Sequence, residues 1–163
     1  MLNQSSFMHD TMIDIVLPTL SGETAGDVRA SLLKSLVSRQ RLYAAAFDIV
    51  LSDPALVDEA LRSAAIGSGV GVTALKVPAL KSAVSVLAKI KSPQALPASD
   101  GRGIDLLCVL LYPESESVHY LRRLSRLTRL FRNPDLCAKI RETDDADTIK
   151  SLIHNPEGWM LAA

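Results

Sequence analysis

Residues 66–77 read Ile66-Gly67-Ser68-Gly69-Val70-Gly71-Val72-Thr73-Ala74-Leu75-Lys76-Val77, and the rest of the chain is organised around them. The glycines of the first half favour positive φ or a close backbone approach, whereas the β-branched residues of the second half favour a half-buried strand. A helical pattern ends just before this run, at residues 58–65. The run therefore predicts a tight turn that carries the chain from a helix into a sheet.

Length and composition fit one domain with a well-covered core, because the chain has 163 residues of which 48% are hydrophobic. We expect one domain over 1–163, with its core at about 20–153 and a loose amino terminus over 1–12. The 18 basic and 18 acidic residues balance, which argues against nucleic acid and anionic membranes as partners. Two isolated cysteines, no secretory signal and no apolar run long enough for a membrane span indicate buried thiols and a cytoplasmic location.

Hydrophobic periodicity predicts helices over 21–39, 55–64, 114–132, 136–142 and 145–153, with a further apolar segment at 42–51. The strand candidates are 70–77, 82–91 and 104–112, and we expect a hairpin around 78–81 to join the first two. Segment 104–112 is the most apolar and is predicted to be a central strand buried on both faces. Segment 12–17 is compatible with a strand or with a brief helical turn. The buried stripe of the long helix is expected to be Leu121, Leu124, Leu127, Leu130 and Phe131, with five arginines on its solvated faces.

The sequence from Asp58 to Ala74 resembles the signature of enzyme IIA domains of the bacterial phosphotransferase system, in the fructose/mannitol and nitrogen-regulatory branch. In that family the pattern runs Arg-Glu, then Ser-Thr-Gly-Ile-Gly-x-Gly-Val-Ala-Ile-Pro-His, and the closing His carries the phosphoryl group. Here Ala74 occupies the His position, Thr73 replaces the Pro, and Asp58 replaces the Arg. The resemblance implies a scaffold that has lost its nucleophile and one positive charge.

Two later blocks resemble the same family. Residues 100–114 resemble its Asp-Gly-x-x-Val-Asp strand ending in Pro-Glu, and residues 119–127 resemble its His-Leu-x-x-Leu-x-x-Leu helix start. The implied fold is α/β, a three-layer sandwich with a mixed β-sheet flanked by helices on both faces, which agrees with the predicted element order. By the resemblance, His119 matches a His that lies beside the phosphohistidine, so it is either a retained ligand contact or a polar group at the rim of the pocket.

The sequence gives less support to the other candidate sites. His9 and His154 lack a partner at metal-ligand spacing, and the carboxylates at 144, 145 and 147 are more simply partners of a helix amino terminus. No Gly-Lys-Ser/Thr follows the glycine run, so it is not a P-loop. Neither Ser63 nor Ser68 has a base nearby in the sequence that would make it a nucleophile. We therefore expect no metal and no cofactor.

These features favour a degenerate nitrogen-regulatory protein that is not phosphorylated at the usual site and acts by binding other proteins, rather than an enzyme. Family resemblance implies the phosphocarrier protein, transporters and sensor kinases as partners. Two alternatives stay open: a working phosphotransfer protein that uses His119 as phosphoacceptor, and a small-anion or metabolite sensor that uses the vacated space beside Ala74. The apolar tail with Trp159 and Leu161 leaves a homodimer open. The expected binding surface comprises Ser68, Val70, Val72, Thr73, Ala74, Leu75 and His119.

Overall fold

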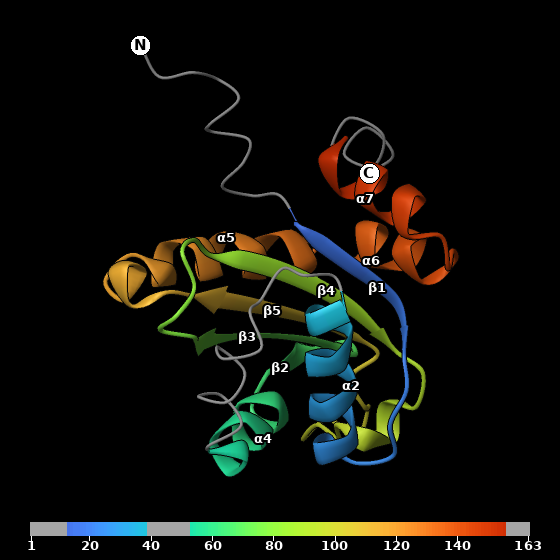
Figure 1. The fold of residues 1–163 in the computed structure, drawn as a ribbon. Coiled ribbons are helices and arrows are strands. Elements are labelled where there is room, and N and C mark those ends of the chain that lie inside the picture. The colour runs from blue at the N-terminus through green and yellow to red at the C-terminus, as the bar shows by residue number, and fades with distance from the viewer. Residues whose placement is uncertain (1–12, 39–52, 156–163) are drawn as a thin grey trace.

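Five strands form one mixed sheet in the computed structural model, which describes residues 13–38 and 53–155 (Figure 1). The strand order is β1-β4-β5-β3-β2. The strands are β1 (Ile15–Leu20), β2 (Ala65–Gly67), β3 (Val70–Lys76), β4 (Val84–Ile90) and β5 (Leu106–Tyr112). The helices are α2 (Ala25–Ser38), α4 (Pro54–Arg62), α5 (Tyr120–Phe131), α6 (Pro134–Arg141) and α7 (Ala146–His154), with short 3₁₀ turns η1 (Pro93–Ala95) and η2 (Glu114–Glu116).

The helices form two layers, one on each face of the sheet. Helices α2 and α4 cover one face, and α5, α6 and α7 cover the other (Figure 1). Each face has its own apolar cluster, because successive strand side chains point to opposite faces. Val109 of β5 packs towards α2 and α4, whereas its neighbour Leu110 packs towards α5. The predicted three-layer α/β sandwich is therefore confirmed.

Strand β5 lies at the centre of the sheet, as its apolar sequence predicts. All of its residues from Leu106 to Tyr112 are buried. It pairs in parallel with β3 and antiparallel with β4. The predicted hairpin between residues 70–77 and 82–91 is wrong for this reason: the most apolar strand takes the position with two covered faces, and so separates β3 from β4. The chain leaves β3 past the end of β5, where the Val77 N–H donates to the Tyr112 carbonyl (2.9 Å).

Of segment 12–17, left open by the sequence, residues 15–17 belong to the strand β1, which pairs in parallel with β4, and residue 12 lies outside the described residues. Pro18 lies inside this strand. A proline removes one ladder hydrogen bond, which is tolerated here because β1 is an edge strand and its register shifts between Leu17 and Leu20. The edge position therefore explains how the strand continues past Pro18.

The helix predicted over 114–132 is divided into the 3₁₀ turn η2 and the helix α5. Leu127 and Phe131 are buried as predicted, and Leu124 and Leu130 are partly buried. The placement of Leu121 in the buried stripe is wrong, because its side chain is 57% exposed. Figure 1 shows why: α5 begins beyond the ends of the strands, so its first turn has no sheet beneath it.

Several expectations concern residues outside the described part of the chain. These are the loose terminus at 1–12, the apolar segment at 42–51, and the tail with Trp159 and Leu161. Within the described ranges, no helix combines the length and the apolar character that crossing a bilayer would require.

The glycine turn joins β2 to β3 and has positive φ at three successive residues: Gly67 (104°), Ser68 (57°) and Gly69 (78°). Arg141 of α6 fixes this turn. Its Nε and Nη2 atoms donate to the two carboxylate oxygens of Asp105 at 2.7 and 2.9 Å, and Nη2 also donates to the Ser68 carbonyl at 2.8 Å. The hydrogen bond to Asp105 raises the pKa of Arg141, so the guanidinium stays charged. One arginine thus holds the turn against the start of β5.

A Gly69→Ala substitution should be more destabilising than Gly101→Ala. Both glycines have φ near 80°, and this strain alone costs about 1 kcal/mol in the free energy of unfolding. Of the two, only at Gly69 would a Cβ meet other atoms, the Asp105 carboxylate at 2.8 Å and Arg141 Nη2 at 3.1 Å, whereas at Gly101 it would meet nothing within 4 Å. We expect Gly69→Ala to cost roughly 1–3 kcal/mol more in urea unfolding, as overpacking does. Equal losses for the two variants would show that the Arg141–Asp105 contact does not constrain the turn.

Candidate functional site

The candidate site lies where the parallel strands β3 and β5 end. The two strands pair in register, with Ala74 opposite Leu110 and Lys76 opposite Tyr112. Helix α5 follows β5 after the short turn η2 and packs over β3, with His119 at its amino-terminal cap position. Residue 74 and residue 119 are therefore brought to the same end of the sheet, as the family resemblance implies.

Aromatic and ionic contacts hold the start of α5 at this end of the sheet. The rings of Tyr112 and Tyr120 stack in parallel with centroids 4.1 Å apart. Lys76 at the end of β3 lies 3.3 Å from the carboxylate of Glu114, but the two side chains are 43% and 64% exposed, so the pair contributes little stability. The pKa of Tyr112 is raised by burial and by the neighbouring Tyr120 and Glu114, so its hydroxyl stays protonated.

Ala74 is partly buried on the face that α5 covers, in the apolar cluster that includes Leu110, Tyr120 and Leu124. Its methyl group can donate and accept nothing. Thr73 is the nearest hydroxyl in the sequence, but it is the adjacent residue of the same strand and so points to the opposite face. Position 74, on the face that α5 covers, is therefore apolar.

The expected binding surface does not form one continuous patch. Ser68 lies at the other end of β3, six residues before Ala74, which is about 20 Å along an extended strand. Val70 and Leu75 are only 3% and 9% exposed, and they pack on opposite faces of the sheet. The alternation of side chains along the strand thus distributes the predicted residues over two faces and two ends, and it leaves Val72, Ala74 and His119 on the α5 side.

His119 is exposed, and its imidazole makes no capping hydrogen bond. Only its backbone is engaged, since its carbonyl accepts from the Arg122 N–H at 3.2 Å. Two apolar side chains beside it are strongly exposed: Val118 at 80% and Leu121 at 57%. Sequence reasoning missed this pair, although Val118 stands out as a lone apolar residue in a polar turn. The start of α5 therefore offers an imidazole flanked by apolar surface.

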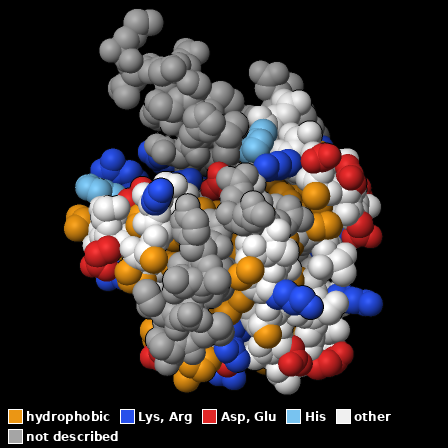
Figure 2. Space-filling view, viewed as in Figure 1, with side chains coloured by type: hydrophobic (Ala, Val, Ile, Leu, Met, Phe, Trp, Pro, Cys, Tyr) orange, Lys and Arg blue, Asp and Glu red, His pale blue; other side chains and the backbone are white. Residues whose placement is uncertain are grey.

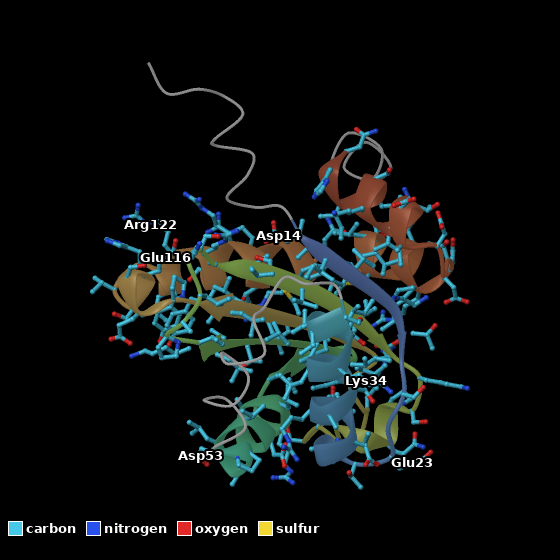
Figure 3. The ribbon with its side chains drawn as sticks, in the orientation of Figure 1. Asp14, Glu23, Lys34, Asp53, Glu116 and Arg122 are labelled. Atoms are coloured by element: carbon cyan, nitrogen blue, oxygen red, sulfur yellow. The ribbon has the colours of Figure 1, made fainter. Side chains whose placement is uncertain are left out.

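A polar cluster that sequence reasoning missed lies along the same end of the sheet. The Ser85 N–H donates to Asp14 at 2.8 Å, and Arg123 of α5 lies 3.9 Å from the same carboxylate (Figure 3 shows Asp14 beside α5). Ser85 Oγ, Arg123 Nε and His154 Nε2 are buried and have no hydrogen-bond partner among the described residues. Ser85 pairs with Leu110, as Ala74 does from the other side, so one row of residues connects this cluster to position 74.

Other chemistry finds little support in the described residues. They contain no group of three or more His, Cys, Asp or Glu side chains placed to hold a metal ion. Cys108 and Cys137 are buried as expected, and burial raises the pKa of both thiols, which keeps them protonated. These thiols are therefore poor nucleophiles.

A hollow of about 270 Å³ lies at the opposite end of the sheet from Ala74. Lys89 in its wall already donates to the carbonyls of Arg141 (3.4 Å) and Thr143 (2.6 Å) and to the Asp144 carboxylate (2.9 Å). The three N–H donors of the Lys89 ammonium group are thus matched by three oxygen acceptors. The hollow is lined by Pro18, Thr19, Lys89, Ile90, Lys91 and Asp144. It is not the space beside Ala74, and it does not support the sensor alternative.

Replacing His154 by Gln should reduce the loss of stability at acid pH. Burial lowers the pKa of His154 and nearby Lys150 lowers it further, against a smaller opposing effect of Asp14. The unfolded chain therefore binds this proton more readily, and native stability falls as the pH drops below about 6.5. We expect urea unfolding at pH 7.5 and 5.5 to show a smaller difference for His154→Gln than for the wild type. An unchanged difference would mean that His154 is not buried as the structure shows.

Comparison with known proteins identifies the fold and the family. Residues 53–155 match the sequence profile of the family described as phosphoenolpyruvate-dependent sugar phosphotransferase system, EIIA 2. A nitrogen regulatory protein from Bradyrhizobium diazoefficiens is 34% identical over 98 residues, which cover 60% of this chain and 64% of that protein. A nitrogen regulatory protein from Escherichia coli is 27% identical over 111 residues, covering 67% and 68%. The Bradyrhizobium match thus spans just under two thirds of that relative's length.

Solved structures agree on the fold. The nitrogen regulatory protein IIA-Ntr from Neisseria meningitidis superposes with a TM-score of 0.63 at 21% identity, over 85% of this chain and 92% of that one. A putative phosphotransferase system IIA domain from Streptococcus pyogenes gives a TM-score of 0.62 at 14% identity, over 95% and 97%. Since the family profile matches well over half of the residues, this chain belongs to the EIIA 2 family of the phosphoenolpyruvate-dependent sugar phosphotransferase system.

Proposed function

We propose that this chain is a cytoplasmic regulator of the nitrogen-regulatory type, which acts by binding other proteins and is not phosphorylated at position 74. The observation that carries the proposal is Ala74 itself, located near the end of β3 on the face that α5 covers. Membership of the family and the names of its relatives support a regulatory role. Beyond family membership and a regulatory role, we propose that the binding activity of this protein is not controlled by a phosphoryl group at position 74.

Phosphotransfer through this site requires a nucleophile that a methyl group cannot replace. An imidazole nitrogen attacks phosphorus with its lone pair, so that an N–P bond forms while the bond from phosphorus to the donor breaks. Ala74 has no such lone pair. Of the two imidazoles in the described residues, that of His154 has its Nε2 buried in the Asp14 cluster. His119 is thus the one described imidazole that is exposed to a donor protein.

His119 fits the role of a contact residue better than that of a phosphoacceptor. A catalytic imidazole is usually oriented by a second group that fixes the ring and the position of its proton. The ring of His119 has no hydrogen-bond partner among the described residues, and Tyr120, which follows it, is stacked on Tyr112. His119 also lies between two exposed apolar side chains, Val118 and Leu121. These apolar neighbours favour a role for His119 in recognising a protein surface.

We propose that this protein acts by binding its partners without itself being phosphorylated. In a phosphorylated regulator, a phosphoryl group adds negative charge and changes which partners bind. Without that group, this chain presents the same surface at all times and behaves like a permanently unphosphorylated member of its family. Its effect would then depend on its concentration relative to its partners. The contact surface we assign is the start of α5 with Val72 and Ala74, in place of the full length of β3.

Phosphoenolpyruvate-dependent phosphorylation tests this proposal. The wild-type chain, Ala74→His and His119→Ala are each incubated with enzyme I, the phosphocarrier protein and phosphoenolpyruvate, and acid-labile phosphohistidine is measured. We expect no label on the wild type and at least about tenfold more label on Ala74→His, because the variant restores a nucleophile at the end of β3. His119→Ala is expected to stay unlabelled.

Two results would contradict the proposal. Labelled wild type together with unlabelled His119→Ala would show that His119 has become the phosphoacceptor. Wild type and His119→Ala labelled to the same extent would place the acceptor elsewhere in the chain. Circular dichroism of all three proteins serves as the folding control. It is needed most for Ala74→His, because residue 74 is partly buried, whereas residue 119 is exposed.

A further inference from the structure

The start of α5 exposes an unusual amount of apolar surface. Among the described residues, the large hydrophobic side chains that are exposed are Val37, Leu56, Val118 and Leu121. Val118 and Leu121 are close in the chain, on either side of His119. Their side chains are 80% and 57% exposed, respectively. Single exposed apolar residues are ordinary, but a neighbouring pair beside a candidate site indicates a contact surface.

The same helix concentrates positive charge in a chain whose net charge is zero. Residues 117–134 contain five arginines and one histidine and no acidic residue. Arg123 turns towards Asp14 and is partly buried. Arg122, Arg129 and Arg132 are exposed and form no ion pair with the described residues. The charge of these three side chains is therefore available to a partner.

The exposed arginines lie on one side of α5. At 100° per residue, Arg122, Ser125, Arg129 and Arg132 fall within about 80° of one another and extend along about 15 Å of the helix. We call these four residues the arginine face. Helical spacing places Leu121 at the edge of the same sector, and Figure 2 shows basic, histidine and apolar side chains together at the left edge, where Figure 1 has the start of α5. Apolar and basic surfaces are thus continuous.

We propose that the arginine face together with Val118 and Leu121 binds an acidic segment of a partner protein, one that carries an apolar side chain next to its carboxylates. The proposal rests on the function proposed above, that this chain acts by binding proteins. The apolar side chain would pack on Val118 and Leu121, and carboxylates would pair with Arg122 and Arg129. Arginine suits this role because its guanidinium can hold a carboxylate through two parallel hydrogen bonds.

The observations favour an acidic protein over a nucleic acid. Nucleic-acid surfaces carry a broad excess of positive charge, whereas this chain is neutral overall. An aliphatic pair also fits an aliphatic or aromatic side chain better than a phosphate or sugar. The mixture of aliphatic and arginine surface is typical of protein interfaces, in which arginine is enriched.

A titration followed by NMR tests this proposal. The full chain, labelled with nitrogen-15, is titrated with the synthetic peptide Glu-Glu-Leu-Glu-Glu-Leu-Glu-Glu, with the same peptide carrying Gln for Glu, and with random-sequence duplex DNA. We expect the acidic peptide to shift amide signals within residues 118–132. The Gln peptide should bind at least about tenfold more weakly, because the charge-assisted contacts are lost.

Matched variants locate the surface. The double variant Arg122→Glu/Arg129→Glu should weaken binding of the acidic peptide by about tenfold or more, since two attractions become repulsions. Leu121→Ser should also weaken it, by roughly three- to tenfold, through the loss of apolar contact. Lys34→Glu is the control: Lys34 is an exposed cation on α2, on the other face of the sheet (Figure 3), and its reversal should leave the affinity unchanged.

Three results would overturn the inference: signals that shift outside residues 118–132, equal affinity for the acidic and Gln peptides, or tighter binding of duplex DNA than of the acidic peptide. Each outcome is independent of the phosphorylation assay. A labelled wild-type chain would refute the proposed regulatory state and leave this surface intact, whereas a failed titration would refute the surface and leave the absence of phosphorylation untouched.

Discussion

The structure depends most on the parallel, in-register pairing of β3 with β5. This pairing sets Ala74 opposite Leu110 and brings the ends of both strands to one edge of the sheet, where α5 begins. At the other end, Arg141 joins the Ser68 carbonyl to Asp105 and so fixes where the two strands start. Because a shift of one residue would turn every side chain of β3 to the other face, this arrangement determines what lies beneath α5.

At this site, the residues that hold α5 in place are not the residue that would carry a nucleophile. Stacking of Tyr112 on Tyr120 and burial of Leu110 and Leu127 hold α5 over the strands, and Ala74 adds only a methyl group to the same apolar cluster. An alanine at that position therefore fits the apolar packing and supplies no nucleophile. Under our proposal, the surface keeps its shape and is not modified at position 74, which suits a regulator that acts through its concentration.

Sequence reasoning predicted most of the fold because its strongest signals were local. The apolar run in β5 and the periodicity of α2 and α4 each specify an element by themselves. The expected hairpin failed because adjacency in sequence does not decide adjacency in a sheet; burial decided it, by placing β5 between β3 and β4. The binding surface was predicted from a run of consecutive residues, and alternation along β3 then divided that run between two faces.

The site residues that sequence reasoning missed are those that only tertiary structure brings together. Asp14, Ser85, Arg123 and His154 come from four separate elements or their ends and converge beneath α5 and α7. Leu121 was assigned to the core because its spacing fits the buried stripe, and only the position of the helix beyond the strand ends exposes it. Periodicity indicates which side of a helix is apolar, but it does not show how far the sheet extends beneath it.

The central claim is that this chain works without a phosphoryl group, and its state in cells tests that claim most directly. The native protein can be isolated from cells with an active phosphotransferase system, kept at alkaline pH where phosphohistidine survives, and measured by intact-protein mass spectrometry. The account predicts a single species of unmodified mass, whether or not the cells were supplied with a phosphotransferase sugar. A second species heavier by one phosphoryl group, whose share changes with the sugar supply, would contradict it.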